Sequence, residues 1–335
     1  MLTAAKLVLP ALAAALFVWG AAWCVVRTLR PQMADTAAVG GEPPRSSKAM
    51  AALAGLLVDE YAKRYLPEDT ARFAYLLSRL KKSMTGLLCY LRDEQRQSCF
   101  KPVACELKIG PGEDAVRGQT YRLSDGRTVQ LIGTVDRADE WIEDDGTRWV
   151  RVVDYKTGTK KLNLKEVYCG LDCQMLLYLF SLWDAPQGKY QGSVPAGILY
   201  MPAKAPKPSL GREAEQADID AQFKKSYCMS GLLLDDEDVL KAMDEEISGI
   251  FIPVKKLAKE KVVEENGEER VVKFTESSPI VTLSELGKLK QYTENLICDM
   301  VQELHQGRIE AVPLDNGSVA CSYCDYRSVC NHQET

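Results

Sequence analysis

Two segments of the sequence carry residues that could bind a metal ion and act on a phosphodiester bond. Asp136 lies in the segment GTVDR, and Asp154 and Lys156 lie in the segment VDYK. Because side chains alternate along a β-strand, we expect Asp154 and Lys156 to share one face of their strand, with Tyr155 on the other. The two segments supply two carboxylates and one amine for a common site.

Pairing of residues 128–136 with residues 148–156 would bring the two carboxylates together. Asp136 would then lie beside Asp154, and two carboxylates on one sheet face repel unless a cation lies between them. Hard oxygen ligands of this kind suit Mg²⁺ or Mn²⁺. Lys156 would orient or activate a water molecule or stabilise charge on a phosphate, which predicts metal-assisted phosphodiester hydrolysis. The alternative is that both aspartates lie in ordinary turns at strand ends.

A second polar pair lies on the helix expected after these strands. Gln174 and Tyr178 stand at positions i and i+4 of the otherwise apolar segment QMLLY, so they share one helix face. We interpret them as a pair directed at the metal site and the DNA backbone. The alternative is a core tyrosine whose hydroxyl has a hydrogen-bond partner.

Three cysteines close to the C-terminus form a C-x2-C-x5-C array. Cys321, Cys324 and Cys330 lie within ten residues, so local folding alone can bring their thiols to one centre. Thiolates prefer zinc or iron–sulfur clusters. His332 would complete a Cys3His zinc site, and the alternative is a set of reduced structural cysteines.

The composition limits the classes of protein to consider. The 335 residues correspond to roughly two domains of about 150 residues. With 46% hydrophobic and 27% charged residues, the chain as a whole is not collagen-like, disordered or a multi-span membrane protein. The net charge of −5 excludes a uniformly basic surface but allows an acidic site neutralised by metal ions. The sequence contains no G-x-x-x-x-G-K-[ST] loop, so it has no nucleotide-driven motor of its own.

Hydrophobic periodicity predicts the elements that position these residues. Helices are expected at 49–65, 68–92 and about 165–183, and strands at 103–108, 120–123, 128–135, 148–155 and 194–201. This order predicts an α/β core with a mixed sheet. An insertion with an acidic helix at 234–248 and a hairpin around Asn266-Gly267 is expected next, followed by an amphipathic helix at 282–307.

The N-terminus begins with an apolar segment. Residues 7–26 form a run of 20 residues without charge, which is long enough to span a bilayer as a helix. Arginines after this run predict that the rest of the chain stays in the cytoplasm, tethered to the inner face of the membrane. Residues 1–30 are therefore expected to be a transmembrane anchor or an artefact of the gene start, and residues 31–48 a linker.

The motifs together resemble a known family. GTVDR, VDYKTG and QMLLY, in this order, resemble the PD-(D/E)xK nucleases of the RecB type. With PAGILYMPAKAP and the closing cysteine array, about residues 50–331 are similar to the C-terminal nuclease domain of the B subunit of bacterial ATP-dependent helicase/deoxyribonucleases. The resemblance implies a restriction-endonuclease-like α/β core at 49–202, an α+β insertion at 203–280, and a C-terminal helix and cysteine cluster at 281–335.

The resemblance also implies roles for the residues of the predicted metal site. Asp136 and Asp154 would bind Mg²⁺ together with the main-chain carbonyl of Tyr155. Lys156 would be the catalytic lysine. Gln174 and Tyr178 would orient the site or the DNA.

The cysteines have an implied role as well. Cys321, Cys324 and Cys330 would be three of the four ligands of a [4Fe–4S] cluster, with zinc as the alternative. The family has its fourth cysteine and a metal-site histidine upstream of the core. The two histidines of this chain, His305 and His332, lie far downstream, and the fourth cluster ligand is not identified.

The resemblance implies a Mg²⁺-dependent DNA nuclease. The expected reaction is exonucleolytic, in a helicase–nuclease that acts in double-strand-break repair and recombination in the cytoplasm. The expected partners are DNA and the A-type helicase–nuclease subunit, which would form a heterodimer with this chain. The alternative is a catalytically degenerate DNA-binding or scaffold module with a structural metal site.

Overall fold

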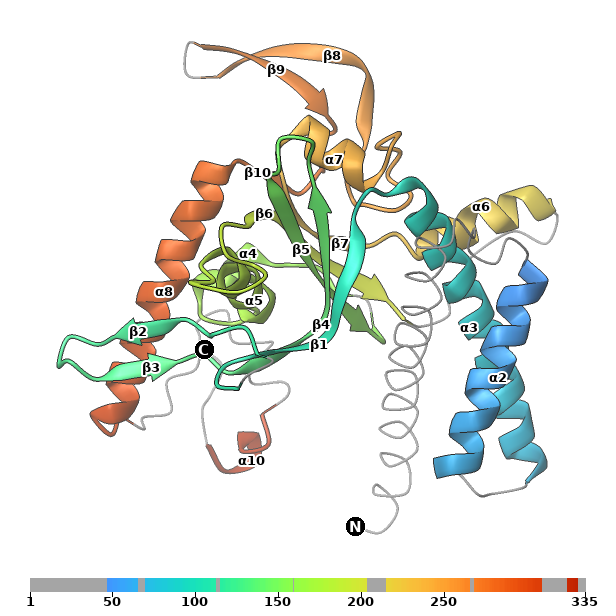
Figure 1. Ribbon diagram of the computed structural model, residues 1–335, viewed down its shortest axis with the longest axis horizontal. Coiled ribbons are helices and arrows are strands. Elements are labelled where there is room, and N and C mark those ends of the chain that lie inside the picture. The colour runs from blue at the N-terminus through green and yellow to red at the C-terminus, as the bar shows by residue number, and fades with distance from the viewer. Residues whose placement is uncertain are drawn as a thin grey trace.

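A mixed six-stranded sheet forms the centre of the computed structural model (Figure 1). The structure describes residues 47–65, 70–112, 115–158, 160–203, 215–265, 268–308 and 324–330. The strands are β1 (Lys101–Ile109), β4 (Gly133–Ile142), β5 (Arg148–Lys156), β6 (Val194–Pro202), β7 (Ser230–Leu234) and β10 (Ile280–Val281), in the order β1-β4-β5-β6-β7-β10. Neighbours β5 and β6, and β7 and β10, are parallel, and the other three pairs are antiparallel.

Helices cover both faces of this sheet. The helices that supply buried residues to the two faces are α3 (Ala71–Gln97) and α7 (Glu237–Met243) on one side, and α5 (Gln174–Trp183) and α8 (Leu283–His305) on the other. Successive residues of β5 alternate between the two cores: Val152 packs on the α5 side and Val153 on the α3 side. Because successive side chains of a strand point to opposite faces of the sheet, β5 contributes residues to both cores.

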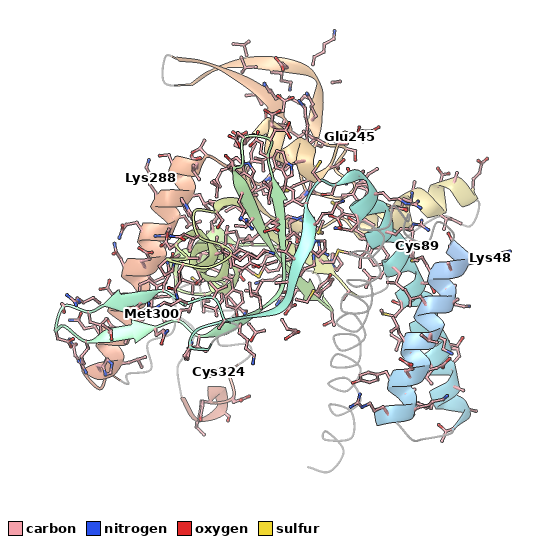
Figure 2. The ribbon with its side chains drawn as sticks, in the orientation of Figure 1. Lys48, Cys89, Glu245, Lys288, Met300 and Cys324 are labelled. Carbon is pink, nitrogen blue, oxygen red and sulfur yellow. The ribbon has the colours of Figure 1, made fainter. Side chains whose placement is uncertain are left out.

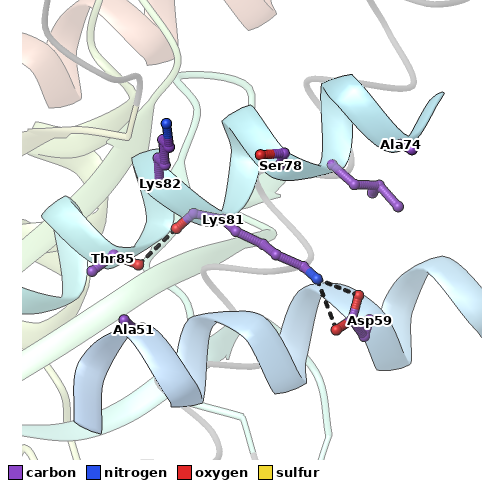
Figure 3. A pocket seen from close by; sticks show the side chains of 8 residues that line it. Ala51, Asp59, Ala74, Ser78, Lys81, Lys82 and Thr85 are labelled. Atoms are coloured by element: carbon purple, nitrogen blue, oxygen red, sulfur yellow. Dashed lines mark hydrogen bonds and ion pairs between the residues drawn. The ribbon is translucent and has the colours of Figure 1, made fainter. Parts of the chain in front are cut away.

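Helix α2 (Ser47–Tyr65) packs along α3 in an antiparallel pair that has its own small core, which includes Met50, Ala54 and Leu88. A groove between the two helices is bordered by an ion pair in which Lys81 Nζ lies 2.6 Å from Asp59 Oδ1 (Figure 3). None of the residues predicted to act in catalysis lines this groove.

Two predicted elements are each divided in the structure. The strand expected at 128–135 is β3 (Thr128–Gln130), which pairs with β2 (Thr120–Arg122), followed by β4 from Gly133. The helix expected at 165–183 is α4 (Leu164–Tyr168) and α5. The second break has a backbone cause, because Gly170 (φ 82°) and Asp172 (φ 55°) adopt left-handed conformations that end a right-handed helix.

The stretch 203–280, expected as an insertion, also contributes to the central sheet. Its described elements are α6 (Gln216–Ser226), β7, α7 and the hairpin of β8 (Lys256–Glu265) and β9 (Glu268–Phe274). Strand β7 pairs with β6, whereas the β8–β9 hairpin projects away from the sheet in Figure 1. The acidic helix expected at 234–248 is the shorter α7.

The predicted membrane span and most of the predicted linker are not tested. Residues 7–26, and the linker up to residue 46, lie outside the described residues; Ser47 and Lys48 begin α2. Among the helices that the structure describes, none is long and apolar enough to cross a bilayer.

Candidate active site

The ends of β4 and β5 bring the predicted metal ligands to one place. The β4–β5 ladder pairs Arg137 with Val153, and one further step along this register reaches Asp136 and Asp154. The backbone N–H of Tyr155 donates a hydrogen bond of 3.0 Å to Asp136 Oδ2. The Asp136 carboxylate therefore lies against the peptide that joins Asp154 to Tyr155.

Asp154 and Lys156 lie on the same face of β5, as the sequence predicts. Lys156 Nζ is 2.6 Å from Asp154 Oδ2, while Tyr155 on the opposite face accepts a hydrogen bond of 3.0 Å from Arg137. The Asp154 side chain is 9% exposed and that of Lys156 is 36% exposed. Burial raises the pKa of Asp154, and the neighbouring Lys156 offsets only part of this effect.

Glu106 is an acidic residue near the site that sequence reasoning missed. On the adjoining strand β1, Cys105 pairs with Arg137 of β4 and Leu107 pairs with Val135. Glu106, between them, therefore lies across from Asp136. Its backbone is left-handed, with φ of 52°, which is costly for a residue with a Cβ. Burial and the nearby Asp136 both raise the pKa of Glu106. A glutamate within the apolar strand segment VACELK is the signal that could have indicated it.

Asp172 is a second carboxylate that sequence reasoning missed. Its Oδ1 lies 2.9 Å from Lys160 Nζ and accepts a hydrogen bond of 3.3 Å from the hydroxyl of Tyr200. Tyr200 pairs with Asp154 in the β5–β6 ladder, and Asp172 contributes to the raised pKa of Asp154. Its Oδ2 is buried without a hydrogen bond to the residues that the structure describes. No local pattern marks this aspartate except that it lies two residues before Gln174.

Gln174 and Tyr178 form the predicted pair on one face of α5. Gln174 Nε2 donates a hydrogen bond of 2.9 Å to the Tyr178 hydroxyl. The ring of Tyr178 packs on Gly133 so closely that a Cβ at this position would lie 2.5 Å from Tyr178 Cε1. The pair thus fixes α5 against the first residue of β4, three residues before Asp136.

We call Glu106, Asp136, Asp154, Asp172 and Lys156 the acidic site. Asp136 and Asp154 with the Tyr155 carbonyl are hard oxygen donors of the kind that Mg²⁺ prefers, and the desolvated Asp154 carboxylate would be stabilised by a cation. In the described part of the chain, no three His, Cys, Asp or Glu side chains are close enough together to hold a metal ion. Asp136 and Asp154 contribute only two such side chains, and together with the Tyr155 carbonyl their chemistry fits a divalent cation.

The cysteine array lies mostly outside the described residues. Cys321 is outside them, and of Cys330 only the backbone, at the end of α10 (Arg327–Cys330), is described. Cys324 is exposed beside α10, and Figure 2 shows Cys89 on α3 well apart from it. Cys89 therefore does not join a site that contains Cys324, and convergence of the three cysteines stays a prediction.

The class of protein follows from a family comparison together with this geometry. A family model, the PD-(D/E)XK nuclease superfamily, matches residues 29–331. The chain belongs to this superfamily, which confirms the predicted fold class and the predicted class of enzyme. The six-stranded mixed sheet flanked by helices is the expected core.

Comparison with individual proteins gives more specific similarities than the superfamily. The chain is similar to the B subunit of the ATP-dependent helicase/deoxyribonuclease of Ruminiclostridium cellulolyticum, with 32% identity over 286 residues, or 83% of this chain and 24% of the relative. The protein of the same name in Anoxybacillus flavithermus is 30% identical over 82% of this chain and 23% of its own length. That of Clostridioides difficile is 27% identical over 84% and 24%. The chain thus spans about a quarter of the length of these relatives.

Proposed function

We propose that this chain is a Mg²⁺-dependent DNA nuclease that cleaves phosphodiester bonds at the acidic site. The observation that supports this most is the pairing of Asp154 with Lys156 at 2.6 Å on the strand face next to Asp136, in a chain of the PD-(D/E)XK superfamily. A carboxylate at this place can bind a metal ion, and the neighbouring amine can stabilise negative charge on a phosphate.

Asp136, Asp154 and the Tyr155 carbonyl would hold the cation. A bound Mg²⁺ would supply a water molecule of lowered pKa and neutralise charge on the phosphate. Before it binds, Asp136 accepts a hydrogen bond from the Tyr155 N–H, and Asp154 is paired with Lys156. These contacts hold both carboxylates at the strand ends, so little side-chain freedom is lost when the cation arrives.

Lys156 would act on the phosphate. Its side chain is partly exposed, while its partner Asp154 is almost completely buried. The ammonium group is therefore the member of the pair that reaches a substrate outside the protein. There it stabilises negative charge on the phosphate oxygens or orients the attacking water. Gln174 and Tyr178 would maintain the position of β4 relative to α5 through the contact with Gly133.

Cleavage of labelled linear DNA with Mg²⁺ tests this proposal. Asp154→Ala and Lys156→Ala are each expected to abolish cleavage while the circular-dichroism spectrum stays that of the wild type. The matched controls are Asp59→Ala and Lys81→Ala, because this pair has the same 2.6 Å separation but lies between α2 and α3. Cleavage at the wild-type rate in either site variant would contradict the assignment. Binding of DNA without cleavage by the wild type would instead support a scaffold module.

The wider role is proposed from the relatives. Their names describe the B subunit of an ATP-dependent helicase/deoxyribonuclease, which supports a nuclease domain that works with a helicase partner. We further propose that this domain degrades DNA in double-strand-break repair and recombination. An exonuclease will degrade linear DNA and leave closed circles intact. Co-elution of the chain with an A-type helicase subunit in size-exclusion chromatography would test the heterodimer.

We also propose that Cys321, Cys324 and Cys330 bind a [4Fe–4S] cluster or, as the alternative, zinc. The support is the C-x2-C-x5-C spacing. A cluster normally takes four thiolates, so this chain is expected to hold iron weakly and to lose it in air. Iron, sulfide and zinc analysis after anaerobic and aerobic purification would distinguish the two metals.

A further inference from the structure

A buried ionic network lies on the α3 side of β4 and β5. We use this name for Glu94, Arg137, Asp139 and Arg151, whose side chains are all at most 2% exposed. Arg137 donates two hydrogen bonds of 2.7 Å to the two oxygens of Asp139, and Arg151 Nε donates one of 2.9 Å to Asp139 Oδ2. Arg151 also pairs with Glu94 of α3 at 2.5 Å. Two positive and two negative charges thus cancel within the network.

Tyr155 links this network to the acidic site. Its hydroxyl accepts a hydrogen bond of 3.0 Å from Arg137 Nη1 on the α3 side, and its backbone N–H donates to Asp136 Oδ2. Its carbonyl belongs to the proposed metal ligands. The Tyr155 side chain is therefore bonded to the network, while its peptide groups lie at the acidic site.

We propose that the hydrogen bond between Arg137 and the Tyr155 hydroxyl positions the metal ligands. This inference rests on the proposed metal-dependent function. The network fixes the Tyr155 side chain relative to Asp139 and α3, and so fixes the peptide on which Asp136 and the cation depend. The side chains of Arg137 and Tyr155 have a positioning role, because their mutual contact lies on the face of the strands opposite Asp154 and Lys156.

Stability alone does not require this arrangement. Well-packed apolar residues often replace a buried ion network without loss of stability, because removing charges from water costs about as much as their attraction returns. A phenylalanine ring at position 155 would fill the same space beside Arg137. The hydrogen bond between the hydroxyl and the guanidinium instead orients the Tyr155 peptide, as hydrogen-bond partners of metal ligands do in other metal sites.

Tyr155→Phe tests the proposal, with Tyr90→Phe as its matched control. Tyr90 is a buried tyrosine of the α3-side core against which the partly buried Tyr155 packs, and its hydroxyl donates a hydrogen bond of 3.0 Å to the carbonyl of Ile250, away from the acidic site. Each variant removes one buried hydroxyl. The first readout is binding of Mn²⁺ to the full chain without DNA, measured by titration calorimetry. The second is the urea concentration at the unfolding midpoint.

We expect Tyr155→Phe to weaken Mn²⁺ binding by about 10-fold, and Tyr90→Phe to leave it unchanged, although both variants lose some stability. Arg137→Lys, which keeps the charge beside Asp139 but loses the bond to Tyr155, is expected to show the same weakening. If Tyr155→Phe and Tyr90→Phe bind Mn²⁺ as tightly as the wild type, and the wild type cleaves DNA, this inference alone is overturned. A wild-type chain that neither binds Mn²⁺ nor cleaves DNA would overturn the proposed function as well.

Discussion

The acidic site and the ionic network use the same two strands and have opposite electrostatics. In the network, two arginines balance two carboxylates, and although burial alone would raise the pKa of Asp139, Arg137 and Arg151 outweigh it and lower that pKa. In the acidic site, carboxylates outnumber nearby cations, and the pKa values of Glu106 and Asp154 are raised. The network contains its own counter-charges, whereas the site has excess negative charge.

The difference separates the residues that hold the strands together from the residues that are proposed to act on DNA. Alternation along β5 puts the Arg151 and Tyr155 side chains on the face of the network and those of Asp154 and Lys156 on the face of the acidic site, so one strand contributes to both. Charge balance lets the network satisfy its charges without a ligand. Excess negative charge makes the site costly without a cation, which is the condition under which metal binding is favourable.

The largest effect is expected from the acidic site. Asp154→Asn should reduce Mg²⁺-dependent DNA cleavage by about 10⁴-fold, about 5.5 kcal/mol in the activation barrier, because a ligand of the cation and the partner of Lys156 are lost together. The fold should remain, since this change removes a charge that burial disfavours. Single-turnover cleavage and the urea unfolding midpoint measure the two quantities. A loss of stability equal to that of the network variant described next would contradict the comparison.

The next effect is expected from the ionic network, on stability. Asp139→Ala leaves Arg137 and Arg151 buried without their shared partner and should lower the free energy of unfolding by about 3–5 kcal/mol. Urea unfolding followed by circular dichroism measures this. Lys81→Ala, which breaks an exposed pair, is the control and should cost at most about 1 kcal/mol. Similar values for the two variants would show that the network does not hold the strands.

A smaller effect is expected at the contact between α5 and β4. Gly133→Ala places a Cβ 2.5 Å from the Tyr178 ring, and the resulting strain should cost about 1–3 kcal/mol. Because Gly133 lies three residues before Asp136, cleavage should fall too. Tyr178→Leu in the Gly133→Ala background makes room and should recover part of the stability. Unchanged unfolding in Gly133→Ala would show that this contact adjusts freely.

The smallest effect is expected on the pH dependence of stability. The pKa of Asp139 is lower in the folded chain than in the unfolded chain, so its stabilisation is fully present above the unfolded value of about 3.8. It is lost as the pH falls from there through the folded pKa. Unfolding midpoints of the wild type and of Asp139→Asn should therefore differ at pH 7 and converge in strong acid. A constant difference at all pH values would contradict this role of the Asp139 charge.

Local patterns in the sequence predicted the parts of the site that depend on local geometry. Alternation along VDYK predicted that Asp154 and Lys156 share a face, and helical spacing predicted that Gln174 and Tyr178 share a face. The structure adds the hydrogen bond between Gln174 and Tyr178. Both patterns depend only on the geometry of a single element. The register of β4 and β5 was also predictable, because the two strands are neighbours in the chain and carry turn signals between them.

Contacts between distant segments were not predictable in the same way. Glu106 enters the site through the pairing of β1 with β4, and Glu94 enters the network from α3, so neither is indicated by its own neighbours in sequence. The break between α4 and α5 was missed because the apolar spacing continues across Gly170. The place of β7 in the central sheet was missed because the linker-like stretch 203–212 and helix α6 separate it from β6 along the chain.

A crystal structure with Mn²⁺, located by its anomalous scattering, tests the central claim most directly. The predicted result is a Mn²⁺ ion bound at about 2.0–2.6 Å by Asp136, Asp154 and the Tyr155 carbonyl, with the two carboxylates about 3–6 Å apart. Absence of Mn²⁺ from this position, or carboxylates more than about 9 Å apart with the ion bound elsewhere, would contradict the account.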